Sequence, residues 1–304
     1  MALDIADQDV ADRSGARPAR KTKRGNELIY RHRLFVRLTH WTNVLCVVLL
    51  LMSGLQIFNA HPRLYWGIKG DEADPAWLSI YAEEQLEGPP IGWVQIGSAN
   101  FNTTGVLGVF RDTDGFFSGR AFPWWVTIPS YVSLAEGRRW HFFFAWLFAL
   151  NGIAYLIYGF AARHFQRDVA PTRSDIRNIG RAILDHLTFK HPRGEAAKRY
   201  NVLQKLAYVA VIFVILPLMI VTGLTMSPGV NAAAPFLPEI FGGRQSARTI
   251  HFIAATLILL FVIVHILQVL LAGFFNEMRS MITGWFAVRP EKIDTKIDTR
   301  RSEP

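Results

Sequence analysis

Two histidines, His251 and His265, lie fourteen residues apart within one strongly apolar stretch, residues 249–274. Fourteen residues is close to four helical turns, so both imidazoles are expected on nearly the same helix face. A rise of 1.5 Å per residue separates them by roughly 21 Å, most of the depth of a bilayer's hydrocarbon core. Ionisable side chains at membrane depth are costly and usually mark function. The spacing predicts two stacked metal centres, and two haems are the obvious candidates.

Four apolar runs are each longer than the roughly 20 residues that a transmembrane helix needs. About half of the residues (51%) are hydrophobic, yet the formal net charge is +9. The basic residues flank the apolar runs and do not form one surface stripe, which argues against a nucleic-acid partner. The sequence therefore predicts an all-α integral membrane protein, a four-helix transmembrane bundle. The predicted spans are residues 38–58, 140–162, 202–226 and 249–274.

Cys46, the single cysteine of the chain, lies within the first apolar run. One cysteine excludes an internal disulfide, a cysteine-ligated zinc or iron–sulfur site and a C-x-x-C-H haem attachment. Any haem in this protein is therefore expected to be non-covalent.

The distribution of Lys and Arg predicts the orientation in the membrane. Segments 1–37, 163–205 and 275–304 together carry 25 of these residues, whereas 59–139 and 227–248 carry eight. By the positive-inside rule, both termini and the middle loop are expected in the cytoplasm. Four spans with both ends inside agree with this count.

The same pattern divides the chain into parts. Residues 1–30 are polar and basic and contain no apolar core of a signal peptide, so we expect a disordered cytoplasmic arm and an uncleaved first span. The membrane domain covers residues 31–275 and includes a cytoplasmic loop at 163–201. A cytoplasmic tail follows at 276–304.

The histidines within the spans pair by membrane level. His40 and His265 belong to the inner side, and His141 and His251 to the outer side. Each pair can supply two neutral imidazoles to opposite faces of a porphyrin. Hydrogen bonding between helices is the alternative role for a histidine inside a span. The other five are expected to be solvated or interfacial: His32, His61, His164, His186 and His191.

Small and basic residues near these histidines are consistent with haem. Gly54 shares a helix face with His40 at the level of the outer pair, where it opens room for a porphyrin; ordinary helix packing is the alternative. Arg37, Arg139 and Arg248 each lie within about a turn of a histidine and can pair with haem propionates. For Arg37, anchoring by the positive-inside rule is an equally good explanation.

The connection at 59–139 is rich in Gly, Pro and Trp and carries many acidic residues. Long loops are usually functional, so we predict a periplasmic cap that covers the outer haem and docks a soluble redox partner. A cap that only shields the haem from water is the alternative. Residues 93–96 and 106–110 are expected as short strands or interfacial turns, and 121–135, with its two prolines, as an interfacial segment. No role is assigned to His61.

The sequence resembles the bacterial di-haem cytochrome b family of the b-561 type, which supplies membrane subunits of nickel–iron hydrogenases and formate dehydrogenases. The resemblance covers about residues 30–275 and rests on RHRLFVRLTHW (31–41), RRWH (138–141) and H-x13-H in the last span. It implies that His40, His141, His251 and His265 are the axial ligands of two b haems. It also implies electron transfer between a partner oxidoreductase outside the bacterial inner membrane and the quinone pool, with a quinone site near the inner haem.

The outer loop differs from the hydrogenase and formate-dehydrogenase pattern. Together with FNAHPRLYWG (58–67) it is more similar to thiosulfate-reductase-type cytochrome b subunits, which are associated with molybdopterin oxidoreductases. The resemblance therefore implies an electron-transfer subunit of a membrane complex, with no catalytic residue of its own.

Two other classes of function stay open. One is a stand-alone quinone-coupled enzyme such as a superoxide oxidase, although a small diffusible donor needs no docking cap. The other is a haem-free membrane anchor or a proton or metal transporter. Proton relays usually recruit Asp or Glu, and the carboxylate nearest to the spans, Glu277, lies beyond the end of the fourth.

Overall fold

The computed structural model describes residues 20–21, 27–71, 74–112, 114–180, 183–184 and 202–288. Two compact units are distinguished. Unit 1 draws on Met1–Arg37, His164–Ala207 and His265–Pro304, and unit 2 on Leu38–Arg163 and Tyr208–Val264.

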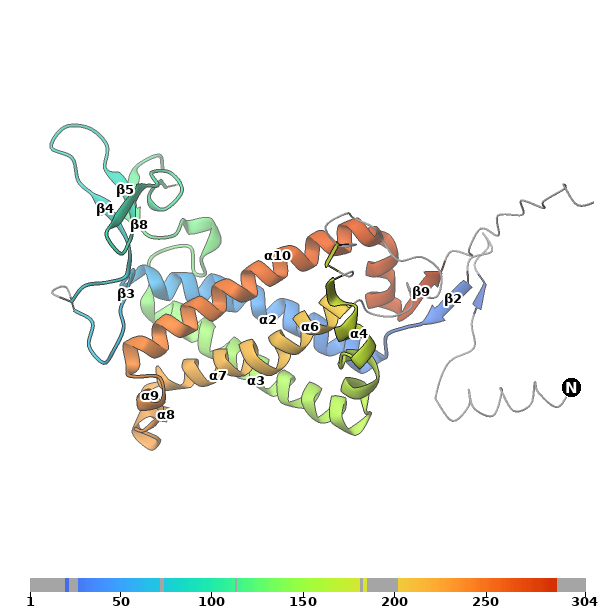
Figure 1. Ribbon diagram of the computed structural model, residues 1–304. Coiled ribbons are helices and arrows are strands. Elements are labelled where there is room, and N and C mark those ends of the chain that lie inside the picture. The colour runs from blue at the N-terminus through green and yellow to red at the C-terminus, as the bar shows by residue number, and fades with distance from the viewer. Residues whose placement is uncertain are drawn as a thin grey trace, which may run out of the picture. The chain divides into compact units, whose positions relative to one another are not determined.

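Four helical segments are long and apolar enough to cross a membrane, which confirms the predicted number of spans. They are α2 (Leu34–Asn59), α3 (Leu134–Ala161), the segment Val202–Thr225 and α10 (Arg244–Thr283). Within unit 2, α2, α3, α7 (Leu216–Thr225) and the first half of α10 run alongside one another (Figure 1). α10 is kinked at Gly273, whose φ of +115° is not helical, close to the predicted end of the span at residue 274; a second helical stretch continues from there to Thr283.

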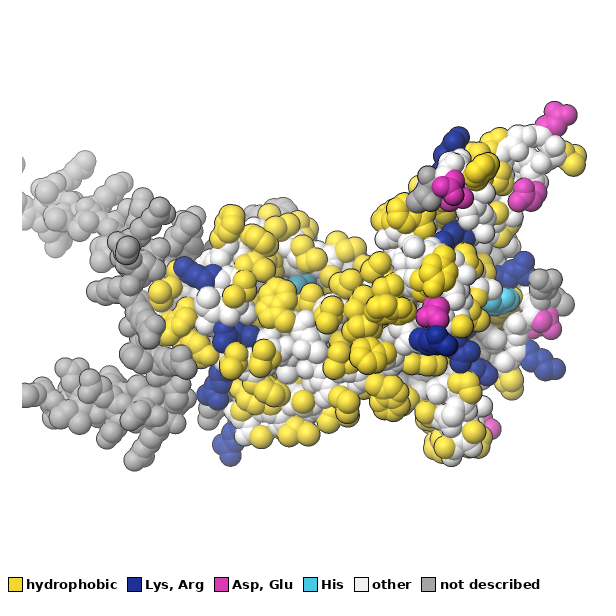
Figure 2. Space-filling view, turned by 180° about the vertical axis from the view of Figure 1, so that it is seen from behind, with side chains coloured by type: hydrophobic (Ala, Val, Ile, Leu, Met, Phe, Trp, Pro, Cys, Tyr) yellow, Lys and Arg dark blue, Asp and Glu magenta, His cyan; other side chains and the backbone are white. Residues whose placement is uncertain are grey.

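The surface of these helices is apolar, as expected for a lipid-facing bundle. Figure 2 shows hydrophobic side chains spread over the helices, whereas the acidic side chains gather towards the cap. Leu45, Leu150 and Leu260 are each more than half exposed. Apolar surface as extensive as this is rare on proteins that live in water.

The third span changes helix type in the middle. It consists of α6 (Val202–Ala210), a π-helical turn at Val211–Ile215, and α7. Pro217 at the start of α7 has no backbone N–H, and its ring crowds the carbonyl four residues earlier. A π-helical turn is a common irregularity at such a point.

The connection at 59–139 is a folded β cap, so the all-α prediction is wrong for this part of the chain. Its main sheet is antiparallel in the order β3-β4-β5-β6, and a second hairpin pairs β7 with β8. The segment 121–135 contains the short helical turn Trp124–Val126, and its interfacial position stays a prediction. The strands are β3 (Arg63–Leu64), β4 (Leu78–Glu83), β5 (Ile91–Ile96), β6 (Ala99–Asn102), β7 (Gly108–Arg111) and β8 (Phe117–Arg120).

The core of the cap also includes residues of the membrane helices. Leu78 and Ile80 of β4 point to the same side because side chains alternate along a strand, and Val94 lies opposite Ile80. Phe58 at the end of α2 belongs to this cluster, and Phe252 of α10 packs against it. The cap is therefore built onto the ends of two spans.

Backbone and hydroxyl groups fasten the cap to the start of α10. The Gly67 carbonyl accepts hydrogen bonds from the backbone N–H groups of Gln245 (3.0 Å) and Ser246 (3.2 Å). These are among the donors that a helix N-terminus leaves without intrahelical partners. The Thr249 hydroxyl donates to the Tyr65 carbonyl at 2.7 Å. The loop is thereby held at the end of the helix that carries His251.

Unit 1 contains a three-stranded antiparallel sheet in the order β1-β2-β9. β1 (Arg20–Lys21) and β2 (Glu27–Tyr30) come from the segment predicted to be a disordered arm, and β9 (Trp285–Val288) from the predicted tail. The arm prediction is therefore wrong for Glu27–Tyr30, because backbone pairing with β9 orders these residues. Residues 1–19 and 22–26 of the predicted arm, 181–182 and 185–201 of the predicted loop with His186 and His191, and 289–304 of the predicted tail lie outside the described residues.

Candidate functional site

His141 of α3 and His251 of α10 face each other in unit 2. Their ring centroids are 6.2 Å apart, and the ring planes are inclined at 64°. A metal bound by one nitrogen from each ring at about 2.0–2.1 Å would place the two centroids roughly 6 Å apart. The structure thus brings together the two histidines that were predicted to pair on the outer side.

The His141 ring is held from the side by α2. Its Nδ1 lies 3.1 Å from the hydroxyl oxygen of Ser53, and it also makes a backbone hydrogen bond with Leu50. The Ser53 hydroxyl lies 2.6 Å from the Leu49 carbonyl. Ser53 is completely buried, so no water competes for these groups.

The His251 ring is held in the same way by α7. Its Nδ1 lies 3.1 Å from the hydroxyl oxygen of Thr222 and 3.1 Å from the Met219 carbonyl. The Thr222 hydroxyl lies 2.6 Å from the Leu218 carbonyl, and Thr222 is also completely buried. Both rings therefore use Nδ1 for hydrogen bonds to a neighbouring helix, and within the described residues neither Nε2 makes one.

A glycine follows each of these hydroxyl residues and lies against the ring. A methyl group built on Gly54 would be 3.4 Å from Cε1 of His141, and one on Gly223 would be 3.3 Å from Cε1 of His251. Gly54 was predicted to make room for a porphyrin, and the structure shows that it makes room for an imidazole. The absence of a Cβ lets each ring approach the helix backbone.

The inner histidines are placed in different units. His40 lies near the start of α2 in unit 2, where its ring meets that of Trp41 edge-on at 5.6 Å. His265 belongs to the part of α10 in unit 1. The pairing of His40 with His265 stays a prediction.

The three arginines predicted to bind propionates have different surroundings. Arg248, one turn before His251, donates to the His61 carbonyl, and its guanidinium lies 5.8 Å from the centre of the Phe58 ring. Arg139 pairs with Glu136 of its own helix at 2.6 Å. Arg37 donates to the Ile282 carbonyl at the end of α10. Arg248 is thus the arginine of the three that stays beside the outer pair.

Sequence reasoning missed Ser53, Thr222 and Gly223. The signal was present as a repeated tripeptide: Ser53-Gly54-Leu55 in the first span and Thr222-Gly223-Leu224 in the third. It also missed Tyr65, whose buried hydroxyl makes no hydrogen bond within the described residues and whose ring stacks on His61 at 5.7 Å. His61 thus lies beside Arg248, which precedes His251 by one turn of α10.

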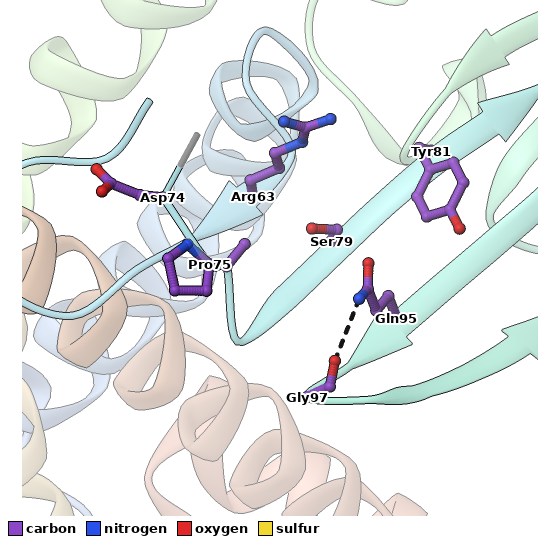
Figure 3. Close-up of a pocket in the computed structure, with 8 residues that line it drawn as sticks. Arg63, Asp74, Pro75, Ser79, Tyr81, Gln95 and Gly97 are labelled. Carbon is purple, nitrogen blue, oxygen red and sulfur yellow. Dashed lines mark hydrogen bonds between the residues drawn. The ribbon is translucent and has the colours of Figure 1, made fainter. Parts of the chain in front are cut away.

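A separate cavity of about 470 Å³ lies in the cap (Figure 3). Ser79 and Gln95 come from its two central strands, and Arg63 and Asp74 bring opposite charges to its rim. The Gln95 amide donates to the Gly97 carbonyl at 3.2 Å. None of the histidines of the spans lines this cavity.

The donor set at the outer pair fits haem. Two neutral imidazoles with free Nε2 atoms are the usual axial ligands of a low-spin haem, whose other four iron ligands come from the porphyrin. Within the described part of the chain, no three His, Cys, Asp or Glu side chains gather to hold a metal ion by themselves. A ligand pair between spans therefore matches a porphyrin iron better than a bare ion.

Four apolar spans with an imidazole pair between two of them define an integral membrane protein of the haem-carrying class. The chain belongs to the prokaryotic cytochrome b561 family, whose family model matches residues 31–284. This confirms the resemblance noted in the sequence. The family carries haem b and transfers electrons in the membrane.

The chain is also similar to a protein of Azospira oryzae described as a putative protein-methionine-sulfoxide reductase subunit, YedZ1. The two are 26% identical over 253 residues, which cover 83% of this chain and 96% of that protein. No solved structure matches the chain.

Proposed function

We propose that this protein passes electrons through two b haems between a periplasmic oxidoreductase and the quinone pool. The observation that carries the proposal is the outer pair, in which His141 and His251 face each other at 6.2 Å with both Nδ1 atoms hydrogen-bonded. Haem b supplies a one-electron ferric–ferrous couple when bound.

Different residues would hold each of the two haems. His141 and His251 present Nε2 at the outer level, and we assign His40 and His265 the same task at the inner level. Arg248 lies one turn from His251 and offers a guanidinium to a carboxylate, an interaction that is strong where water is scarce. Arg37 and Arg139 are weaker candidates for binding a haem propionate, because each already interacts with another group of the protein.

The β cap is the proposed docking region for the electron-exchanging partner. Its residues 61–67 are fastened to the start of α10, next to Arg248 and within a few turns of His251. Trp66 and Phe116 of the cap are more than half exposed, and aromatic side chains of this kind often form the centres of interfaces.

The similar protein of Azospira oryzae is named as a subunit of a protein-methionine-sulfoxide reductase. That name supports a partner that is a reductase or a related oxidoreductase, and we propose a molybdopterin-dependent one ahead of a hydrogenase. The proposed location is the bacterial inner membrane, with both termini in the cytoplasm and the cap in the periplasm, as the Lys and Arg counts favour.

The first experiment measures haem b per polypeptide in detergent-purified protein, together with a reduced-minus-oxidised spectrum. We expect close to two haems. His141→Ala and His251→Ala should each remove the same haem and leave the other, because each removes one of the two imidazoles that would hold it.

His40→Ala and His265→Ala should each remove the second haem. One haem in the unsubstituted protein would contradict the two-haem path, and none would contradict the whole proposal. Loss of the same haem by His40→Ala and His251→Ala would overturn the assignment of the pairs.

A further inference from the structure

We propose that Ser53 and Thr222 are matched positioning residues for the outer haem: together with the neighbouring backbone carbonyls their hydroxyls fix the tautomer of His141 and His251, and they lower the redox potential of the haem that these imidazoles would hold. The inference rests on the proposed ligand role of these two histidines. Neither hydroxyl residue was found from spacing or from resemblance, and both belong to helices that supply no ligand to the outer pair.

A serine or threonine hydroxyl has one hydrogen to donate and two lone pairs. Ser53 lies 2.6 Å from the Leu49 carbonyl and Thr222 lies 2.6 Å from the Leu218 carbonyl, and a carbonyl can only accept. Each hydroxyl hydrogen is therefore used within its own helix, and the oxygen is left to accept from the imidazole.

The tautomer follows from that count. An oxygen that can only accept, 3.1 Å from Nδ1, requires that Nδ1 carry the hydrogen in both rings. A second acceptor faces each Nδ1, because Leu50 and Met219 contribute backbone carbonyls. In a neutral imidazole the other nitrogen then has the lone pair. Nε2 of both rings is thus prepared to bind iron before haem arrives.

The arrangement is repeated around the two imidazoles. In each helix the hydroxyl residue donates to the carbonyl four residues earlier, the carbonyl three residues earlier meets the ring, and the glycine one residue later lies against Cε1. Back-bonding by a serine or threonine is common in helices, but it does not by itself bring an imidazole to the same oxygen. The repetition indicates that the hydroxyl and the glycine together hold the imidazole of a ligand histidine. We call each pair, Ser53 with Gly54 and Thr222 with Gly223, an imidazole seat.

A hydrogen bond from Nδ1 makes the imidazole a stronger donor at Nε2 and fixes its orientation. An imidazole that donates more strongly through Nε2 stabilises ferric iron more than ferrous iron. Each imidazole seat therefore lowers the redox potential of the outer haem. Loss of such a partner typically costs 10- to 100-fold in metal affinity. A tenfold change in the ratio of ferric to ferrous affinity corresponds to about 59 mV for a one-electron couple.

The test is a redox titration of both haems in Ser53→Ala, Thr222→Val and the double variant. We expect each single substitution to raise the potential of the same haem, with a larger rise in the double variant and no change in the second haem. The Leu50 and Met219 carbonyls remain as acceptors, so we expect a shift and retained haem. The electron paramagnetic resonance signal of low-spin ferric iron should change for the same haem and stay unchanged for the other.

Matched controls separate a positioning role from a structural one. Thr256→Val removes a hydroxyl from the same helix as His251, where it bonds only to the Phe252 carbonyl at 2.9 Å, and it should leave both potentials unchanged. Thr222→Ser keeps the hydroxyl and should also match the unsubstituted protein.

Unchanged potentials in Ser53→Ala and Thr222→Val, or an equal change in Thr256→Val, would overturn the inference. Loss of the outer haem in Ser53→Ala, with the second haem retained and Thr222→Ser intact, would support it. A preparation of unsubstituted protein without any haem would instead contradict the proposed function, so the two failures are distinguishable.

Discussion

The imidazoles of His141 and His251 are oriented by hydrogen bonds within the apolar interior of the bundle. A bare imidazole between apolar helices is costly, and here the cost is offset by hydrogen bonds from Nδ1 to a buried hydroxyl and a backbone carbonyl. The same bonds hold each ring at a fixed angle. Binding of an iron then requires little rearrangement of the protein side chains, which is the advantage of a prepared site.

A prediction at this scale concerns the glycines behind the rings. Gly54→Val and Gly223→Val should reduce the occupancy of the outer haem, because even a methyl group there would stand 3.4 or 3.3 Å from an imidazole carbon. Overpacking of this kind costs about 1–3 kcal/mol. Haem content per polypeptide is the measurement.

Gly152→Val provides the control for these glycines, since a methyl group on Gly152 meets nothing within 4 Å. It places the same β-branched side chain in another span and should leave two haems. An equal loss of haem in all three variants would mean that helix propensity, and not the seat of the imidazole, is responsible.

Elements of the cap depend on close backbone packing. Gly92 of β5 lies against the start of β7, where a Cβ would stand 2.9 Å from the backbone nitrogen of Val109 and closer still to the Leu107 carbonyl. Gly108 in the same contact has a φ of +85°, a conformation that other residues rarely adopt. The second hairpin therefore joins the main sheet through two glycines.

We expect Gly92→Ala to loosen the hairpin from the sheet, with a cost of about 1–3 kcal/mol because backbone cannot move aside as a side chain does. The rate of proteolytic cleavage within residues 59–139 should rise. Ser98→Ala, at an exposed position in the β5–β6 turn, is the control and should be cleaved as slowly as the unsubstituted protein. Equal rates in both variants would contradict the packing argument.

In unit 1, the short helix α4 (Arg173–Arg177) is tied to α6 by an ion pair between Asp175 and Lys205 at 2.8 Å. The hydrogen bond from Lys205 and those from Thr172 lower the pKa of Asp175 below its ordinary value. A carboxyl group with a lowered pKa stabilises the folded form above its unfolded pKa, and this contribution is lost as the pH falls through the folded pKa.

Hydrogen exchange of the amides in α4 should therefore accelerate as the pH is lowered below about 3.9, the ordinary pKa of Asp, after correction for intrinsic exchange. Asp175→Asn should exchange faster at neutral pH and lose this acid dependence. An unchanged acid response in Asp175→Asn would show that another group is responsible.

For the whole molecule, the uneven distribution of charges along the chain is the property that predicts its orientation in the membrane. Lys and Arg are concentrated in segments 1–37, 163–205 and 275–304, which flank the spans, whereas the cap segment 59–139 carries many acidic residues. The single cysteine, Cys46, is completely buried. The chain is therefore well suited to labelling at one introduced thiol.

We expect Ser98→Cys in the cap, in a Cys46→Ser background, to react with a membrane-impermeant thiol reagent in intact spheroplasts. Ser174→Cys in α4 should react only after the membrane is opened. Both positions are exposed in the structure. The reverse pattern would invert the proposed topology. Reaction of both in intact spheroplasts would contradict the single span, α3, that lies between them.

The sequence by itself determined the spans, the ligand candidates and the family, because these depend on local properties. A bilayer requires a certain length of apolar helix, and a histidine in such a helix stands out without any knowledge of its neighbours. In the cap, β5 and β7 fall on the two segments expected as strands or turns, but their pairing with β3, β4, β6 and β8 into sheets was not predicted. Sheet pairing depends on partners distant in the chain.

Only the tertiary structure decided what surrounds the outer imidazoles. Ser53 is 88 residues from His141, and Thr222 is 29 residues from His251. Spans that are apolar all round have no periodic stripe from which to read the face that meets a neighbour. The rotation of each helix about its own axis is set by packing. The contacts of Ser53, Gly54, Thr222 and Gly223 with the imidazoles therefore depend on the tertiary structure.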